Sequence, residues 1–307
     1  MYDLIIIGGG PAGTAAGVYA ARKQIKTLLI AESFGGQSVE SNEIQNWIGT
    51  KSISGIDLAK NFKDHVAFYA STFVEIKDGE NVSKIEHIEQ DGFIVTTNKG
   101  SYRTKAVLVA TGGSRRKLNI QGAREFEGRG ITYCASCDGP FFADKEVVVI
   151  GGGNAGFESA LQLVAYCKHV TLLSRSEFKA DPTTIEKALQ NKKMRAIPNA
   201  EPIEIKGDGF VKSIVYKTTK PFVEDVEIPT AGIFVEIGHL PATSFVEGLV
   251  DMDEFKRIIV DHKTERTSVE GIWAAGDCTD VLYHQNNIAA GDAVKALEDI
   301  YLWLRKA

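Results

Sequence analysis

At 307 residues the chain is long enough to form two domains of ordinary size, each with its own core. Hydrophobic residues make up 44% and charged residues 24%, typical of a soluble globular protein, and the net charge of −5 gives no basic field for nucleic acid. Apolar runs fall short of the ~20 residues of a membrane span, and the first strand begins too early to leave room for a signal peptide. Four cysteines are too few for a disulfide scaffold, so we expect a cytoplasmic protein.

A buried strand is predicted at residues 4–7, directly before a glycine-rich turn. Gly8, Gly10 and Gly13 form a G-x-G-x-x-G fingerprint. In such a turn the glycines allow a tight bend, close approach of the backbone to a pyrophosphate, and close packing of the next helix. Small residues over 14–21 predict that helix. This beginning favours a dinucleotide-binding unit over a simple strand and turn.

The unit closes with a second buried strand at residues 27–30, followed by the acidic residue Glu32. Glu32 lies about 20 positions past Gly13, the spacing at which a carboxylate binds a ribose hydroxyl. The first 33 residues therefore predict a βαβ unit. Further strands are predicted at residues 74–76, 92–97 and 105–110.

A second unit of the same plan follows, and its first strand is predicted at residues 147–150. The strand leads into a second fingerprint, Gly151, Gly153 and Gly156, with a helix predicted to begin at Asn154. Two fingerprints in the same strand-turn-helix context predict two dinucleotide sites.

The second unit differs from the first at its end. After a closing strand at residues 170–173, Ser174 and Arg175 stand where the first unit has Glu32. Arg175 could pair with a 2′-phosphate, which a carboxylate would repel, and Lys179 offers a second cation. This favours NADPH at the second site; the alternative is that Arg175 is a solvated surface residue.

Three more strands and a final amphipathic helix are predicted, at residues 214–217, 232–238, 271–277 and 289–304. No low-complexity tract or long linker interrupts the chain, so the domains must be joined by two short crossings, near residues 113–116 and 238–243. We predict an α/β fold of two Rossmann-like, three-layer ββα domains, the second inserted into the first. Their expected ranges are residues 1–114 with 243–307, and 115–242.

A Cys-x-x-Cys pair, Cys134 and Cys137, precedes the second fingerprint, and Asp138 follows it. Structural zinc is disfavoured because the other candidate ligands, Cys167, His169 and Cys278, have no usual ligand spacing, and we expect no metal. Two inert buried thiols are a second alternative. A redox-active dithiol is the preferred interpretation, since thiolates form near neutral pH in such motifs. Asp138 could relay a proton, and it could also cap a helix.

Two dinucleotide sites and one dithiol predict an electron path from a nicotinamide nucleotide through a flavin to a disulfide. Cys167 and Cys278 are expected to be small core residues.

With these motifs the whole chain resembles the low-molecular-weight thioredoxin reductases, and also the reductase core of the flavoprotein subunit of alkyl hydroperoxide reductase. The segments that carry the resemblance are the two fingerprints, Gly35-Gly36-Gln37, Asn46-Trp47, Ala110-Thr111-Gly112, Cys134 to Gly139 and Ala275-Gly276-Asp277-Cys278. Cys-x-x-Cys-Asp-Gly just ahead of a second nucleotide fingerprint is highly specific.

The resemblance implies Cys134 and Cys137 as the redox pair and Asp138 as the acid/base. It implies that the discontinuous domain binds FAD through Gly8, Gly10, Pro11, Ala12, Gly13, Glu32, Gly36, Gln37, Asn46, Gly112, Asp277, His284, Gln285 and Asn286. It implies that the inserted domain binds NADPH or NADH through Gly151, Gly153, Asn154, Gly156, Arg175 and Lys179. It also implies a homodimer, and a rotation of one domain against the other during turnover.

Three departures from thioredoxin reductases bear on the electron donor and partner. The His-Arg-Arg-x-x-x-Arg stretch of NADPH-dependent members reads Ser174 to Lys179 here, one residue shorter, so the donor could be NADPH, NADH or another carrier. His284-Gln285 replaces the Arg-Gln flavin contact. Finally, residues 32–37, 179–181 and 232–241 are more similar to the peroxide-reductase flavoprotein, whose additional thioredoxin-like domains we do not find; we therefore expect electrons to pass to a separate protein.

The leading hypothesis is an FAD-dependent thioredoxin-disulfide reductase that passes electrons from NAD(P)H to a thioredoxin- or glutaredoxin-like protein. The alternatives are the reductase component of a peroxiredoxin system, a thioredoxin reductase with a donor other than NADPH, and a ferredoxin–NAD(P) reductase-like flavoprotein, which needs no dithiol. A non-catalytic redox sensor is the alternative outside the enzymes.

Overall fold

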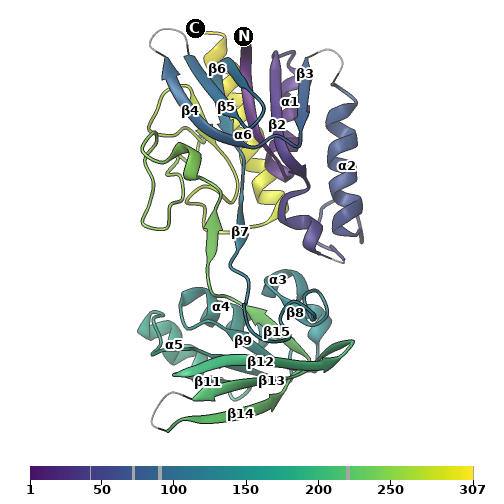
Figure 1. The fold of residues 1–307 in the computed structure, drawn as a ribbon, viewed down its shortest axis with the longest axis vertical. Coiled ribbons are helices and arrows are strands. Elements are labelled where there is room, and N and C mark those ends of the chain that lie inside the picture. The colour runs from purple at the N-terminus through teal and green to yellow at the C-terminus, as the bar shows by residue number, and fades with distance from the viewer. Residues whose placement is uncertain (42, 71–72, 89–91, 219–221, 307) are drawn as a thin grey trace. The chain divides into compact units, whose positions relative to one another are not determined.

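The computed structural model describes residues 1–41, 43–70, 73–88, 92–218 and 222–306. The chain divides into two compact units (Figure 1). Unit 1 comprises Met1–Ser114 and Leu240–Ala307, and unit 2 comprises Arg115–His239. The second junction thus lies at 239/240, where the sequence suggested 242/243. The strands at the two junctions, β7 (Gly113–Arg115) and β16 (His239–Pro241), pair with each other.

Unit 1 is built on a seven-stranded sheet in the order β3-β2-β1-β6-β5-β4, with β17 also paired to β6. The strands are β1 (Tyr2–Gly9), β2 (Thr27–Phe34), β3 (Val74–Asp78), β4 (Val82–Ile88), β5 (Gly92–Thr97), β6 (Ser101–Val109) and β17 (Ile272–Ala274). The three central strands are parallel, with Ile6 of β1 opposite Leu29 of β2 and Leu108 of β6. β4 and β5 form an antiparallel extension.

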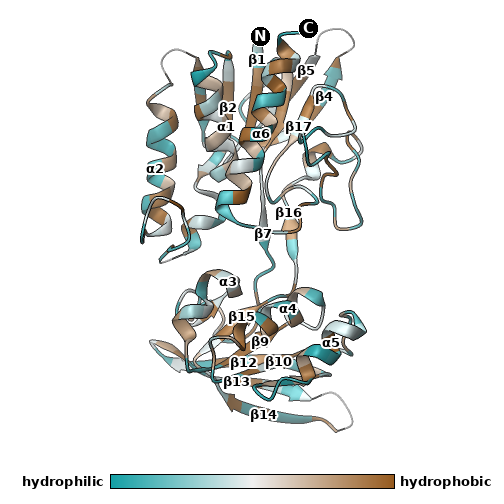
Figure 2. Cartoon of the chain, turned by 180° about the vertical axis from the view of Figure 1, so that it is seen from behind, coloured by the Kyte–Doolittle hydropathy of each residue, from teal (hydrophilic) through white to brown (hydrophobic). Residues whose placement is uncertain are grey.

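Alternation along β1 places successive side chains in different cores, as the two-residue period of a strand requires. Leu4 and Ile6 face a core shared with the helices α1 (Pro11–Arg22) and α6 (Asn286–Leu304). Ile5 and Ile7 face a second core, which includes β5 and the loops before β17. Because both faces of the central sheet are covered, its strands read as continuous apolar runs. Figure 2 shows these hydrophobic strands together with the mixed character of α2 (Gly55–Ala67).

Helix α2 is not among the elements predicted from the sequence, although both its start signal and its apolar spacing are present. The Ser54 side chain accepts a hydrogen bond from the backbone N–H of Asp57, an N-cap. Leu58, Phe62 and Val66 follow at four-residue intervals and are buried. A 3₁₀ helix, η1 (Gly36–Glu40), precedes α2, and a second in this unit, η3 (Ser244–Val246), follows β16.

Unit 2 has a parallel five-stranded sheet in the order β11-β10-β9-β15-β8 and a three-stranded antiparallel sheet β12-β13-β14. The parallel strands are β8 (Ile131–Thr132), β9 (Glu146–Ile150), β10 (His169–Leu173), β11 (Met194–Ile197) and β15 (Gly232–Val235), and the antiparallel ones are β12 (Ala200–Asp208), β13 (Phe210–Thr218) and β14 (Glu224–Pro229). The helices are α3 (Ala135–Asp138), the 3₁₀ helix η2 (Gly139–Phe142), α4 (Asn154–Leu163) and α5 (Pro182–Leu189).

The same two-residue alternation organises the layers of unit 2. Val147 and Val149 of β9 pack in a core with α4, while Val148 and Ile150 pack in a core with β12 and β13. The order is therefore antiparallel sheet, parallel sheet, helices, which confirms the predicted ββα arrangement for this unit. The predicted strand 232–238 ends earlier, at Val235. Among the described helices, none is long and apolar enough to span a membrane.

Candidate nucleotide and dithiol sites

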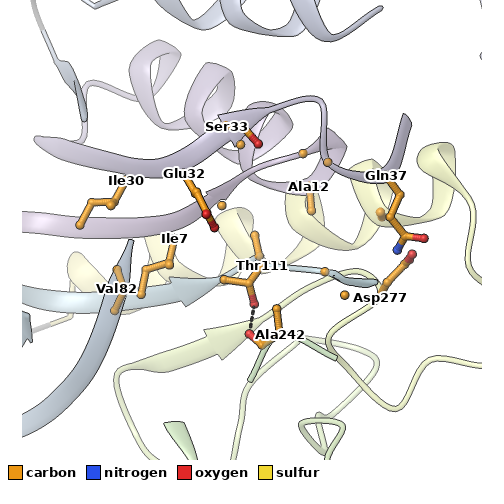
Figure 3. A pocket seen from close by; sticks show the side chains of 18 of the residues that line it. Ile7, Ala12, Ile30, Glu32, Ser33, Gln37, Val82, Thr111, Ala242 and Asp277 are labelled. Carbon is orange, nitrogen blue, oxygen red and sulfur yellow. Dashed lines mark hydrogen bonds between the residues drawn. The ribbon is translucent and has the colours of Figure 1, made fainter. Parts of the chain in front are cut away.

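Unit 1 contains a cavity of about 350 Å³ next to the first glycine-rich turn. Ten of the predicted flavin-site residues line it: Gly8, Gly10, Pro11, Ala12, Glu32, Gly36, Gln37, Gly112, Asp277 and Asn286. They come from segments far apart in the chain, which the parallel strands bring to one edge of the sheet. In Figure 3 Gln37 and Asp277 point toward one another, while Glu32 lies nearer to Ile30 and Val82.

Glycine suits each of the three fingerprint positions of unit 1 for a different structural reason. Gly8 has a φ of +125°, and a Cβ there would lie 2.2 Å from the carbonyl oxygen of Ala110. A Cβ on Gly13 would lie 1.8 Å from the carbonyl oxygen of Gly8, so this position allows α1 to pack against the turn. A Cβ on Gly10 would lie no nearer than 3.8 Å to any protein atom. Because glycine has no Cβ, this position leaves space in the cavity wall.

Four predicted flavin contacts, Gly13, Asn46, His284 and Gln285, lie outside the lining of this cavity. The Asn46 side-chain amide donates to Oε1 of Gln285 at 3.0 Å, and Ser38 Oγ donates to Oδ1 of Asn286 at 3.2 Å. These bonds connect the loop before α2 to the start of α6. The structure therefore brings Asn46 and Gln285 together, but as partners of each other.

The cavity wall also contains residues that the sequence motifs do not indicate. Glu80, Asn81 and Val82 line it because the backbone N–H groups of Gly79 and Glu80 bond to the carbonyl of Ala31 and bring this turn beside β2. Asn81 Nδ2 donates to Oε2 of Glu32 at 3.4 Å. A β3–β4 turn carries no local sign of a ligand, so its sequence alone could not reveal this placement.

The residues of this cavity fit a dinucleotide such as FAD. A glycine turn opens onto the N-terminus of α1, where unsatisfied N–H groups suit a phosphate. Glu32 supplies an exposed carboxylate at the end of the neighbouring strand, which suits a ribose hydroxyl. Ile7, Ile30 and Val82 supply apolar wall.

The second glycine turn, in unit 2, repeats the geometry of the first. Gly151 has a φ of +147°, and a Cβ there would lie 2.2 Å from the carbonyl oxygen of Glu236. A Cβ on Gly156 would lie 2.0 Å from the carbonyl oxygen of Gly151, and one on Gly153 would meet no protein atom within 4 Å. The correspondence supports the same use, a close backbone approach to a pyrophosphate at the start of α4.

The segment after β10 lies against this turn. The backbone N–H of Lys179 bonds to the carbonyl of Gly152 at 2.8 Å, which fixes the segment over the turn. Asn154 and Asp181 bond reciprocally: Nδ2 of Asn154 donates to Oδ2 of Asp181 at 3.0 Å, and the backbone N–H of Asp181 donates back at 2.8 Å. The side chains of Arg175 and Lys179 are exposed, as a contact with a mobile substrate requires.

Cys134 and Cys137 form a disulfide in unit 2, with their Cα atoms 5.3 Å apart. Cys134 is the N-cap of the short helix α3, and its Sγ accepts a hydrogen bond from the backbone N–H of Cys137 at 3.2 Å. Both residues are half-buried. The carboxyl group of Asp138 accepts a hydrogen bond from Thr132 Oγ1.

The comparison with protein families supports this arrangement. The family model described as pyridine nucleotide-disulphide oxidoreductase matches residues 2–293, which is most of the chain. The chain belongs to this family. The chain is therefore an oxidoreductase, as its resemblance to the thioredoxin reductases implied, and its two glycine turns and its disulfide belong to that class of enzyme.

The names of similar proteins indicate different activities. Over 96% of its length the chain is 41% identical to a subunit of the alkyl hydroperoxide reductase of Escherichia coli and 38% identical to a protein named NADH dehydrogenase of Bacillus subtilis. It spans about 57% of the length of these two relatives. The solved thioredoxin reductase of Streptococcus pyogenes is 34% identical and superimposes with a TM-score of 0.92, covering 100% of this chain and 99% of that one.

These likenesses confirm the predicted α/β fold with two Rossmann-like parts. The oxidoreductase has the fold of thioredoxin reductases, while a relative of higher identity is named for the reduction of alkyl hydroperoxides.

The other two cysteines of the oxidoreductase are buried and free. Burial raises the pKa of Cys167, and it raises that of Cys278 to about 11. Since the thiolate is the reactive form, burial disfavours reaction at both thiols. The expectation that they are small core residues is confirmed.

Burial also raises the pKa of Asp138, and the hydrogen bond from Thr132 opposes this only in part. The folded protein therefore keeps this proton to a higher pH than the unfolded chain does, so ionisation destabilises the fold as pH rises from the ordinary aspartate pKa through the folded value. We expect Asp138→Asn to raise the melting temperature at neutral pH, by an amount that disappears below about pH 4. Thermal unfolding against pH measures this, with the exposed Asp208→Asn as control; an equal gain at all pH values would contradict it.

Proposed function

We propose that this oxidoreductase uses bound FAD and the Cys134–Cys137 disulfide to pass electrons from NAD(P)H to the disulfide of a partner protein. The observation that carries the proposal is the disulfide itself: it closes at a helix N-terminus, beside the half-buried carboxyl group of Asp138, in the same unit as the second glycine turn. A ferredoxin–NAD(P) reductase would need no such pair.

The residues of unit 1 would hold the FAD. Gly10 and the N-terminus of α1 would hold its pyrophosphate, and Glu32 would hold its ribose. When bound, FAD supplies hydride acceptance from a nicotinamide and transfer of the electron pair to a disulfide. Gln37 and Asp277 would contact it at the other end of the cavity.

The two cysteines carry the exchange with the partner. When the Cys134–Cys137 bond is reduced, one thiolate attacks a sulfur of the partner disulfide, and a mixed disulfide forms as the partner's other sulfur leaves as a thiolate. The second cysteine thiolate then attacks the mixed disulfide, which restores the Cys134–Cys137 bond and releases the partner as a dithiol. Two electrons leave the enzyme in each exchange, and the partner takes up two protons.

Asp138 would hold and return a proton during this exchange. Its raised pKa and its position next to Cys137 suit a general acid and base. Asp138→Asn should therefore slow disulfide reduction by about 10²- to 10⁴-fold while flavin reduction by the donor keeps its rate. Stopped-flow absorbance separates the two half-reactions; equal slowing of both would exclude a proton role confined to the dithiol.

The proposed partner is a small thioredoxin- or glutaredoxin-like protein, as for the thioredoxin reductases that share this fold. A second candidate is the reductase component of a peroxiredoxin system, which the 41% identity to the alkyl hydroperoxide reductase subunit favours. Steady-state oxidation of the donor with thioredoxin, and with a peroxiredoxin plus peroxide but no thioredoxin, distinguishes the two. The resemblance to thioredoxin reductases also leads us to propose a homodimer.

The proposed donor is NADPH, supported by the exposed cations Arg175 and Lys179 after β10 and by the absence of a carboxylate at Ser174. NADH is the second candidate, because a relative 38% identical to this chain is named NADH dehydrogenase. Arg175→Ala should raise KM for NADPH about tenfold or more and leave KM for NADH unchanged. If the flavin is reduced much faster by NADH in the wild type, the argument from Arg175 fails.

A further inference from the structure

An ion pair in unit 2 has no part in the function proposed so far. Nη1 of Arg115 lies 3.3 Å from Oε2 of Glu236, and the Glu236 side chain is only 6% exposed. The other carboxylate oxygen, Oε1, accepts a hydrogen bond from Ser159 Oγ of α4 at 2.7 Å. The pKa of Glu236 is raised, because burial, together with the nearby Glu158, outweighs the opposing effects of Arg115 and Ser159. A carboxylate buried in this way is costly unless its partners are well placed.

The pair lies at the carboxyl ends of the parallel strands, where a dinucleotide binds in this class of fold. Glu236 directly follows β15, which flanks β9 on the side opposite to β10. After β9 the chain continues to β10 on one side of it, while β15 pairs with β9 on the other side, so the strand order reverses at this point. In such sheets ligands bind in the crevice outside the carboxyl ends of the strands where the order reverses. A Cβ on Gly151 would lie 3.2 Å from the Cβ of Glu236, so the carboxylate branches from the backbone beside the glycine turn.

Arg115 is held at the same end of the parallel strands. The backbone N–H of the next residue, Arg116, bonds to the carbonyl of Gly238, which places this strand beside the segment after β15. A guanidinium carries five N–H donors, and the bond to Glu236 uses one of them. Arg115 is 23% exposed, so the rest of the group can meet a ligand.

We propose that Arg115 contacts the pyrophosphate of the nicotinamide nucleotide bound in unit 2, and that Glu236, fixed by Ser159, is the positioning residue that aims its guanidinium. Guanidinium–phosphate pairs are strong and directional because the cation is planar and its donors are fixed. Neither residue belongs to the glycine fingerprint or to the Arg175 segment. The inference rests on the proposed function, in that it takes the ligand of unit 2 to be a nicotinamide dinucleotide.

The test measures binding to the full-length flavoprotein by calorimetry, with NADP⁺, NAD⁺ and ADP-ribose as ligands. Arg115→Met should weaken binding of the preferred dinucleotide about tenfold to a hundredfold. ADP-ribose retains the pyrophosphate but lacks the nicotinamide; its 2′-phosphorylated form is used if the wild type prefers NADP⁺. The affinity of Arg115→Met for this ligand should fall by the same factor. If only the complete dinucleotide is weakened, Arg115 contacts the nicotinamide part and the assignment to the pyrophosphate is wrong.

A double-mutant cycle tests the positioning role of Glu236. Glu236→Gln alone should weaken binding by about three- to tenfold, and in the Arg115→Met background it should weaken it no further. Equal losses in both backgrounds would overturn the role, since a purely structural effect does not depend on Arg115. The matched controls are Arg195→Met, at an exposed position of the edge strand β11, and Glu146→Gln, at the opposite end of β9, and both should bind as the wild type does.

The binding results separate this inference from the proposed function. Wild-type affinity in both Arg115→Met and Glu236→Gln, with the wild type binding NADP⁺ or NAD⁺, would overturn this inference alone. A wild type that holds flavin and reduces disulfides with another electron carrier, but binds neither nucleotide, would overturn the proposed donor and this inference together.

Discussion

Cys134→Ser or Cys137→Ser should abolish disulfide reduction while the flavin is still reduced by the donor nucleotide. Each variant removes one sulfur of the only disulfide among the described residues. The other two cysteines, Cys167 and Cys278, offer no reactive thiolate in its place because they are buried with raised pKa values. We expect turnover with a thioredoxin-like substrate to fall at least about a thousandfold, as for loss of a catalytic nucleophile.

Ser136→Ala is the matched control for this experiment. Ser136 lies between the two cysteines and is exposed, with its Oγ 3.3 Å from Cys134 Sγ, and its replacement removes no sulfur. It should retain most of the activity. Loss of flavin reduction together with disulfide reduction in Cys134→Ser would contradict the assignment, because it would place the cysteines in flavin binding or in the fold.

Gly10→Ala and Gly153→Ala should each remove one nucleotide and leave the protein folded. A Cβ on Gly10 would meet no protein atom nearer than 3.8 Å, and one on Gly153 none within 4 Å, so the fold has room for both substitutions. The added methyl group would instead occupy the space that a pyrophosphate needs against the turn. Gly10→Ala should therefore lose FAD affinity roughly a hundredfold or more and be purified nearly colourless.

Gly153→Ala should be yellow, because unit 1 is unchanged, yet its flavin should be reduced by NADPH or NADH only at concentrations roughly a hundredfold higher. Absorbance of the purified proteins and stopped-flow flavin reduction measure these outcomes. Gly8→Ala is the structural comparison: its Cβ would lie 2.2 Å from a backbone oxygen, so this variant should lose thermal stability as well. A colourless Gly153→Ala and a yellow Gly10→Ala would reverse the assignment of the two sites.

Local patterns were sufficient for the parts of the fold that the two glycine turns organise. The apolar runs before Gly8 and Gly151 are buried on both faces, as central parallel strands are, and the fingerprint glycines have the backbone conformations and close contacts that the motif requires. The disulfide between Cys134 and Cys137 agrees with the spacing of the motif.

Other features depend on contacts between segments far apart in the chain. Glu80 to Val82 reach the flavin cavity only because the turn before β4 bonds to Ala31, and no pattern around them signals a ligand. Asn46 and Gln285, assigned to the flavin by resemblance, bond to each other across 239 residues of sequence. Asp138, a candidate helix cap, stands at the N-cap position of η2, but its side chain makes no capping hydrogen bond and accepts one from Thr132.

The Arg115–Glu236 pair shows the same limit. Arg115 ends a strand that is too short to predict, and Glu236 follows an apolar strand where a surface glutamate would be the ordinary interpretation. Their meeting depends on the pairing of the segments at 116 and 238, which only the three-dimensional structure reveals.

The central claim is that one electron path includes both a flavin and the Cys134–Cys137 disulfide, and anaerobic titration with NADPH or NADH tests it most directly. The wild type should consume about two hydride equivalents per flavin, one for the flavin and one for the disulfide, while Cys134→Ser should consume about one. Free thiols counted after the titration should rise in the wild type alone. A wild type that accepts only about one equivalent and gains no thiols would contradict the account.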